Sequence, residues 1–251
     1  MFKVFDEQGI NVCFGVVRDG RRHFIKFAGA KPINIVYCNG ADAAFAVDCL
    51  KKAAAIYRDL DHPSLIKFIG AEEIGGGFAA AFEWTDAVGI EPLDSPDYMR
   101  FMRMPVDKKM AAFDDILDFH AHVAAKGYVA LDFYDGSIMY DYDADKAVIC
   151  DIDFYQKAPY VGNIGTWGSA RFVSPEECVS GAVMDEVTNV YTMGATAFSI
   201  FAYGNRAPEA WSLNGALYGV AKKAVSDGRA LRQQSIAQLI AEWNEAKRRR
   251  D

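Results

Sequence analysis

The segment that most constrains this chain is Tyr128–Tyr155, in which two aspartates each follow a short apolar run. Asp132 follows YVAL and opens an irregular loop, FYDGS, whereas Asp153 follows AVICDI and precedes Phe154. IMY and AVIC predict two short strands joined by the acidic turn Asp141–Lys146. A hairpin is a rigid way to hold two carboxylates from distant positions on one wall of a cleft. Either aspartate taken alone is more simply an ordinary loop or strand-end acid, so the rest of the chain has to decide.

Composition excludes several classes of protein. The net charge of −7 and the pI near 5.2 argue against a nucleic-acid binder, which needs a basic face, and we expect Lys247–Arg250 to be a solubilising helix end. No apolar run reaches the length of a membrane span, and the start, MFKVFDEQG, turns acidic at once, which is unlike a signal peptide. The five cysteines are scattered, with no C-x-x-C pair, which predicts reduced thiols in a cytoplasmic protein without zinc or disulfides.

The pattern along the chain changes from strands to helices. VCFGVV and HFIKF, joined by RDGR, predict one hairpin, and LIKFIGAEEI and FAAAFEW, joined by GGG, predict a second. Apolar residues at helical spacing predict a helix between these hairpins and four more after Trp84. The predicted helices are Asp42–Leu60, Met110–Lys126, Val187–Tyr203, Trp211–Ser226 and Ser235–Arg249.

Five segments, taken in order, resemble the motifs of one family. HFIKF, with Lys26, is similar to V-A-I-K; ALDFYDGS is similar to HRDLKPEN; and DFY is similar to DFG. Gly168–Glu177, GSARFVSPEE, resembles G-T-x-x-Y-x-A-P-E, and Asn189–Gly194, NVYTMG, resembles D-V-W-S-x-G. Taken singly, each match is weak: Lys26 could be a strand lysine facing solvent, and Ser-Pro-Glu is a common helix start. Because all five occur in the family's order, at intervals close to the family's, the chain resembles the protein-kinase-like superfamily, in a divergent and bacterial or phage-like form.

The resemblance implies an α+β, two-lobed protein-kinase-like fold. Residues 1–84 would form a small strand-rich lobe with one helix, and residues 85–251 a mainly helical lobe containing the catalytic hairpin, with a boundary near Trp84–Gly89. It also implies ATP and Mg²⁺ as cofactors. Phe82 would limit the depth of an adenine pocket, and the backbone of Glu83 and Trp84 would hydrogen-bond the adenine ring. A plain strand end is an equal alternative for these three residues.

The same resemblance implies the catalytic roles. Lys26 would orient the α- and β-phosphates, Asp132 would position the acceptor hydroxyl and take its proton, and Asp153 would hold Mg²⁺. Ser137 stands where the family has an asparagine that binds a second Mg²⁺.

Three further residues would support these groups. Ser169 would take the place of the threonine that meets the catalytic aspartate, and Glu176 would form an ion pair, with Arg232 as the expected partner. Asn189 replaces an aspartate that accepts backbone hydrogen bonds from the catalytic loop, and its amide oxygen can still accept them.

The chain departs from the family in the groups that surround the lysine. Before Lys26 only Gly9 and Gly15 are available, so G-x-G-x-x-G is absent. The helix glutamate that should pair with the lysine falls at Ala53, and Asp48 belongs to a different helical face. We expect these departures to weaken two functions: the covering of the phosphates by backbone N–H groups and the positioning of Lys26.

The catalytic and metal-binding loops depart as well. Ala130-Leu131 replaces His-Arg, which removes the charge partner of a phosphorylated activation loop. Tyr134 stands where a lysine would touch the γ-phosphate, and Tyr155 replaces the glycine of DFG, which should restrict that loop. Asp151 is an extra acid, for which a solvent-facing position is the simpler expectation.

Three functions follow from this pattern. The first is an ATP- and Mg²⁺-dependent phosphotransferase resembling Ser/Thr protein kinases, acting on a protein substrate, with no nucleic-acid or membrane partner. The second is a pseudokinase, a nucleotide-binding or scaffolding module that presents its surface to a protein partner. The third is a small-molecule kinase, which ranks last because its relatives usually lack a segment like GSARFVSPEE.

Overall fold

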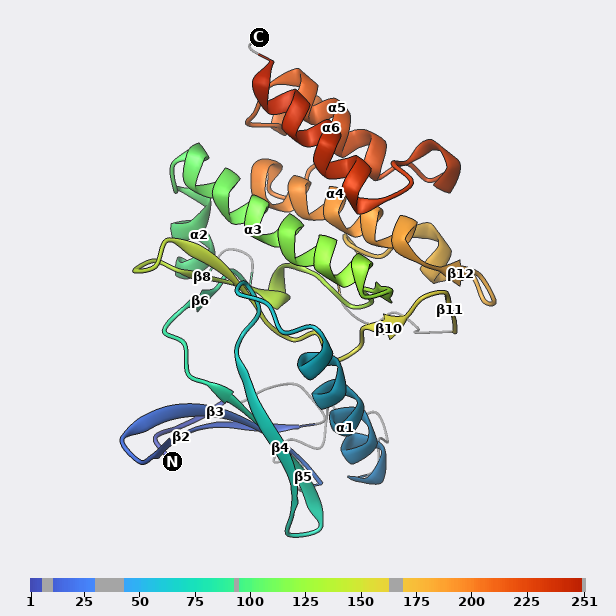
Figure 1. Cartoon of the computed structure of the whole chain (residues 1–251). Coiled ribbons are helices and arrows are strands. Elements are labelled where there is room, and N and C mark those ends of the chain that lie inside the picture. The colour runs from blue at the N-terminus through green and yellow to red at the C-terminus, as the bar shows by residue number, and fades with distance from the viewer. Residues whose placement is uncertain (6–10, 30–42, 93–94, 163–168, 250–251) are drawn as a thin grey trace. The chain divides into compact units, whose positions relative to one another are not determined.

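The chain forms two compact units. The computed structural model describes residues 1–5, 11–29, 43–92, 95–162 and 169–249. Contacts divide it into Met1–Asp86 and Ala87–Asp251. The protein is a mixed α+β chain, in which a strand-rich sheet lies in the N-terminal unit and most helices lie in the C-terminal unit (Figure 1).

The N-terminal unit is built on a five-stranded antiparallel sheet with the order β1-β2-β3-β5-β4. Both predicted hairpins are confirmed: Asp19 and Gly20 turn between β2 and β3, and Gly75 and Gly76 turn between β4 and β5, all four with positive φ. Positive φ is accessible to glycine and tolerated by aspartate, which is why these residues mark the turns. The strands are β1 (Lys3–Phe5), β2 (Val12–Arg18), β3 (Arg21–Ala28), β4 (Phe68–Ile74) and β5 (Gly77–Glu83).

Helix α1 (Ala43–Asp59) covers one face of this sheet and confirms the helix predicted there, apart from Asp42, which lies outside the described residues. Its buried side chains recur at helical spacing and include Tyr57. The Tyr57 ring meets Phe82 of β5 edge to face, with ring centroids 4.8 Å apart. Phe68 of β4 completes the cluster, at 5.5 Å from Phe82.

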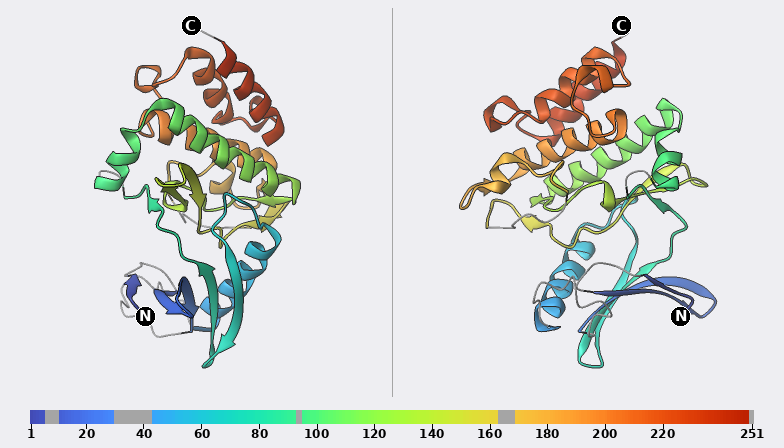
Figure 2. Two further views of the ribbon diagram at one scale, coloured as in Figure 1. Left: turned by 60° about the vertical axis from the view of Figure 1, so that its left-hand side comes forward. Right: turned by 180° about the vertical axis from the view of Figure 1, so that it is seen from behind.

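The C-terminal unit is a stack of helices around α4. Figure 2 shows α3 and α4 side by side, with α5 and α6 beyond them, and all neighbouring pairs make contact. Every residue of α4 from Thr188 to Ala202 is buried, because helices pack around it. A Cβ at Gly194 would lie 2.7 Å from Cβ of Ala224, so the glycine allows close approach of α4 and α5. The helices are α2 (Pro96–Met102), α3 (Val106–Ala125), α4 (Glu186–Ala202), α5 (Gly215–Ala224) and α6 (Ile236–Arg248).

Three small sheets lie in the same unit. The predicted central hairpin is confirmed, with β8 (Ile138–Asp141) paired to β9 (Lys146–Ile149). Asp141 caps its turn by accepting the backbone N–H groups of Asp143 and Ala144. The other short strands are β6 (Val88–Gly89), which joins β8, β7 (Tyr128–Val129), paired with β10 (Gln156–Lys157), and β11 (Tyr160–Val161), paired with β12 (Val183–Met184).

Some predicted boundaries were wrong. The helix expected from Trp211 begins at Gly215, because the side chain of Asn214 caps it by accepting the N–H of Leu217 at 2.8 Å. Helix α2 was not predicted, although Ser95 and Pro96 carry a helix-start signal.

Short 3₁₀ helices also occur, at η2 (Asp135–Ser137), η3 (Pro175–Cys178), η4 (Pro208–Ala210) and η5 (Arg229–Leu231). Across the described parts of the chain, none of the helices is both long and apolar enough to cross a membrane.

Candidate active site

Asp132 lies in a loop that is held in place from α4. Its φ of 63° is left-handed, a conformation that aspartate tolerates better than most residues. Asn189 accepts the backbone N–H of Ala130 at 2.7 Å, as predicted for its amide oxygen. Asn189 also donates its side-chain N–H to the carbonyl of Tyr128 at 2.9 Å, which an aspartate could not do. The amide therefore fixes the chain just before Asp132 through two opposite hydrogen bonds.

The Asp132 carboxyl opens into a small pocket whose lining includes Ser169, Glu177 and Thr192. Burial, followed by the charges of Asp151, Asp153 and Glu177, raises the pKa of Asp132 to about 7. Among the described residues, no hydrogen-bond donor meets its buried Oδ1 atom. A carboxyl with a pKa near neutrality is suited to take a proton from a hydroxyl. Ser169 lines the same pocket, as its predicted role requires.

Asp153 belongs to a tight turn after β9. The backbone N–H of Tyr155 donates to the carbonyl of Ile152 at 3.2 Å and closes this turn around Asp153. The influence of Asp151 and Asp153 on the pKa of Asp132 places the three carboxyls near one another. Asp151 is exposed, as expected, and has a positive φ of 54°.

Ser137 is buried between the catalytic loop and β9. Its N–H donates to the carbonyl of Tyr134 at 3.0 Å, and its carbonyl accepts the N–H of Cys150 at 2.9 Å. The side chain is fully buried, and its hydroxyl oxygen has no partner among the described residues. A buried hydroxyl normally has a partner, so this atom is free to bind a water molecule or an ion.

The side-chain oxygen atoms of Asp153 and Ser137 are of the type that a hard divalent cation prefers, but they do not form a complete coordination shell. No set of three or more His, Cys, Asp or Glu side chains converges on a metal position within the described ranges. Mg²⁺ in phosphate-binding sites is usually held by one or two carboxylates together with water and phosphate oxygens. The carboxylate of Asp153 and the hydroxyl of Ser137 are ligand types of this kind.

An ion pair that was not predicted from the sequence, Asp135–Arg171, ties the loop after Asp132 to the segment that follows Ser169. Asp135 is fully buried, and its Oδ2 accepts the guanidinium of Arg171 at 2.7 Å and the hydroxyl of Ser199 at 3.2 Å. Burial, followed by the charge of Asp135, raises the pKa of the nearby Glu91. The pair was not predicted, because Asp135 and Arg171 are far apart in the chain and stand at motif positions for which the resemblance implies no role.

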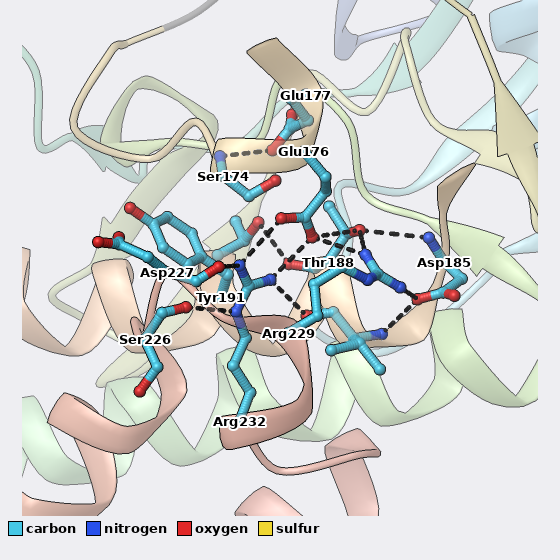
Figure 3. A network of polar contacts seen from close by, with 12 residues as sticks. Ser174, Glu176, Glu177, Asp185, Thr188, Tyr191, Ser226, Asp227, Arg229 and Arg232 are labelled. Atoms are coloured by element: carbon cyan, nitrogen blue, oxygen red, sulfur yellow. Dashed lines mark hydrogen bonds and ion pairs between the residues drawn. The ribbon is translucent and has the colours of Figure 1, made fainter. Parts of the chain in front are cut away.

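Glu176 is the centre of a dense polar network (Figure 3). Its predicted ion pair with Arg232 is confirmed, with both carboxylate oxygens bound, at 2.7 and 2.9 Å. Arg229 adds a contact of 2.7 Å to Glu176 and one of 2.6 Å to Asp185, the N-cap of α4. Burial opposes ionisation, but hydrogen bonds from Arg232 hold the pKa of Glu176 below its ordinary value. The network fixes the end of the GSARFVSPEE segment to α4 and η5; Arg229 is the member that the sequence analysis missed.

In the N-terminal unit, Lys26 lies on the α1-facing side of the sheet. Its side chain is 9% exposed, so the alternative of a solvent-facing strand lysine is wrong. The register pairs Phe24 with Phe82 and Lys26 with Ala80, which puts all four side chains on the same face. The structure therefore brings Lys26 and Phe82 together on one surface.

The helix that covers this face is apolar around the position of the expected glutamate. Ala53, at the position of the expected glutamate, is fully buried, as are several apolar neighbours on α1. Asp48 is exposed and forms an ion pair with Lys52 at 2.7 Å. The replacement of the expected glutamate by Ala53 thus corresponds to an apolar face of α1.

Glu83 and Trp84 already use their backbone N–H groups inside the N-terminal unit. Glu83 donates to the carbonyl of Lys67 at 2.9 Å, and Trp84 donates to that of Arg22 at 3.4 Å. A Cβ at Gly15 would lie 2.9 Å from the Trp84 ring, so this glycine serves ring packing. The other glycine of this region, at position 9, lies outside the described residues.

No model of a known protein family matches this chain, and no curated protein matches its sequence. The C-terminal unit contains Asp132, a carboxyl whose pKa is raised to about 7, with other carboxylates nearby. The other unit presents a buried lysine, Lys26, beside an aromatic residue.

Proposed function

We propose that this protein is an ATP- and Mg²⁺-dependent phosphotransferase resembling Ser/Thr protein kinases, which transfers the γ-phosphate to a hydroxyl group. The observation that carries the proposal is Asp132, with a pKa of about 7, in a pocket and on a loop fixed by Asn189. A carboxyl placed in this way is costly to keep and is typical of catalytic sites.

In the proposed reaction, Asp132 hydrogen-bonds the acceptor hydroxyl and takes its proton as the oxygen forms its bond to the γ-phosphorus. The bond from that phosphorus to the bridging oxygen breaks, and ADP leaves with the electron pair. Bound Mg²⁺ supplies charge neutralisation for the phosphate oxygens, and Asp153 and Ser137 would hold it. Catalysis of this kind depends mainly on placement, so altered supporting groups lower the rate more than they abolish it.

The nucleotide-binding residues in this proposal are Lys26, Phe82, Glu83 and Trp84. Lys26 would bind phosphate oxygens, and its burial beside Phe82 supports a role other than solubility. Because the N–H groups of Glu83 and Trp84 are engaged, their carbonyl groups would meet the base instead.

The substrate side of the proposal is a protein. Ser169 lines the Asp132 pocket, and the segment to which it belongs ends at the Glu176 network, so its position near Asp132 is fixed by buried ion pairs. Such a segment is suited to hold a peptide hydroxyl near the pocket. A cytoplasmic location is part of the proposal, and it rests on the scattered cysteines of the sequence.

A pseudokinase remains the second candidate because specific contacts favour it. The face of α1 at Ala53 is apolar, where the kinase motif has a glutamate. Gly15 packs under aromatic rings, a use different from covering a phosphate. On this alternative, the chain acts through its surface, with or without a bound nucleotide.

A thermal-shift titration tests the nucleotide and Mg²⁺ binding that catalysis requires. The native chain, Asp153→Ala and the exposed-turn control Asp143→Ala would be titrated with ATP, with and without Mg²⁺. A ligand at 100 times its Kd stabilises the folded state by about 2.7 kcal/mol. The proposal expects Mg-ATP to raise the Tm of the native chain and of the control, with the Mg²⁺-dependent part absent from Asp153→Ala.

A transfer assay with a generic protein substrate would follow, with Asp132→Asn as the inactive variant. No change of Tm at millimolar Mg-ATP would refute the catalytic proposal and leave the scaffolding module. Nucleotide binding without transfer, in an assay that detects a control kinase, would favour a nucleotide-binding pseudokinase.

A further inference from the structure

One buried histidine contacts both loops that carry the proposed catalytic aspartates. His120 of α3 is fully buried, and its Nδ1 lies 2.8 Å from the carbonyl oxygen of Ile116. A carbonyl can only accept, so Nδ1 carries the proton and, in the neutral ring, Nε2 is an acceptor. The hydroxyl of Tyr155 lies 3.0 Å from Nε2 and is the donor of this second bond.

Two of the residues that contact His120, Tyr155 and Phe133, lie close in sequence to different aspartates. Tyr155 is two residues after Asp153 and closes the turn that contains it. Phe133 directly follows Asp132, and its ring centroid is 4.5 Å from that of His120, in an edge-to-face arrangement. Both aromatic side chains are almost fully buried. A single imidazole is thus wedged between the loop of Asp132 and the loop of Asp153.

The loops of Asp132 and Asp153 share His120 as a buried neighbour. A glycine in place of Tyr155 would leave the turn free to move. The tyrosine makes movement costly, since its ring would have to leave the core and its hydroxyl would lose a buried acceptor.

We propose that His120 and Tyr155 are positioning residues, which hold the loops of Asp132 and Asp153 in one arrangement and so set the geometry of the proposed phosphoryl-transfer site. This inference rests on the proposed function for its catalytic meaning, but the loop coupling itself can be measured without any ligand. It also assigns Tyr155 a function, the support of both loops, whereas the sequence alone indicated only that this residue restricts its own loop.

The test compares Tyr155→Phe with Tyr218→Phe, which removes another hydroxyl of the same unit, one that donates to the carbonyl of Arg206 at 3.0 Å. Amide hydrogen exchange would be followed in peptides covering residues 130–135 and 151–156. Loss of a buried partner should give roughly tenfold faster exchange in both peptides of Tyr155→Phe. Neither peptide should change in Tyr218→Phe. The apparent affinity for Mg²⁺ in the presence of ATP should weaken about tenfold in Tyr155→Phe alone, as for other supports of a metal site.

A double variant, His120→Leu with Tyr155→Phe, separates positioning from stability. Replacing both partners by apolar groups leaves no unpaired atom, so the Tm lost in Tyr155→Phe should largely return. The directional bond is still absent, so both loops should keep their fast exchange. Recovery of slow exchange together with the Tm would overturn the proposal.

Two other results would also overturn it: faster exchange in only one of the two peptides, or equally faster exchange throughout α3 and α4. If the native chain does not respond to Mg-ATP, the proposed phosphotransferase function fails. The exchange of the two loops then decides on the coupling by itself.

Discussion

Replacing the proposed catalytic aspartate should make this protein more stable at alkaline pH. The pKa of Asp132 is raised from 3.8 to about 7 in the folded chain, first by burial and then by neighbouring carboxylates. Its ionised form is therefore disfavoured by folding, and the Asp132→Asn variant has no charge to bury. Asparagine also tolerates the left-handed φ of 63° at this position, so the substitution adds little backbone strain.

The size of the effect follows from linkage between protonation and folding. A group whose folded pKa is raised favours the folded state fully below its unfolded pKa and loses that contribution as pH rises through its folded pKa. At 1.36 kcal/mol per pKa unit, the loss is complete above pH 7 and amounts to about 4 kcal/mol. At pH 4.5 only about 1 kcal/mol is lost, because the carboxyl in the folded state is still protonated.

Urea unfolding of the native chain and of Asp132→Asn at pH 4.5 and pH 8.5 measures this directly. The variant's advantage in unfolding free energy should grow by about 3 kcal/mol between these two pH values. Asp143→Asn, in the exposed turn of the central hairpin, should show no such growth. A variant that is less stable than the native chain at pH 8.5, or whose advantage does not depend on pH, would refute the reasoning.

Three further substitutions test the supports of the site by urea unfolding. Arg232→Met removes the main partner of the buried Glu176 and should cost about 3 kcal/mol, the low end for a broken buried pair, because a second arginine stays in contact; an unchanged midpoint would show that this second contact suffices. Asn189→Asp keeps the acceptor but replaces an N–H donor to a backbone carbonyl by a carboxylate oxygen, and should cost about 1–3 kcal/mol, whereas a neutral effect would rule out the two-sided hydrogen bonding. Gly194→Ala places a methyl group 2.7 Å from Cβ of Ala224 and should cost about 1–3 kcal/mol, unless α4 and α5 can separate at no cost.

Local signals in the sequence predicted the elements that local physics determines. The turns at Asp19-Gly20 and Gly75-Gly76 require positive φ, and the residue types at these positions supply it. Helix α1 could be predicted because its apolar residues recur at helical spacing over 17 residues. The two-residue strands, by contrast, are too short for any period to show, and they form only where a distant segment supplies hydrogen bonds.

The candidate site could be predicted only where a motif fixes a residue pair. Arg232 was identified as the partner of Glu176, whereas Arg229, three residues earlier, could have been noticed as a second arginine on the same turn. His120 gave no signal, because a single histidine within an apolar helix is most often a core residue. Its partner Tyr155 lies in another element, and only the folded chain shows that they meet. The pKa of Asp132 was unpredictable for the same reason, since burial and neighbouring charges are properties of the fold.

The two units differ in how they accommodate their departures from the kinase motifs. In the C-terminal unit two of the departures have gained a contact: Asn189 donates as well as accepts, and Tyr155 is bound to His120. In the N-terminal unit, Ala53 packs in an apolar helix face without replacing the expected glutamate. Nucleotide binding is therefore required for catalysis, whereas phosphate transfer is the step on which catalysis and scaffolding make different predictions.

The cost of Asp132 bears on that choice. A scaffold that never transfers phosphate gains nothing from a desolvated carboxyl among like charges, and an asparagine in its place would recover about 4 kcal/mol at alkaline pH. That energy is a large fraction of the stability of a typical domain. If urea unfolding confirms this difference, the stability lost at Asp132 would support the proposed phosphotransferase over the scaffolding module.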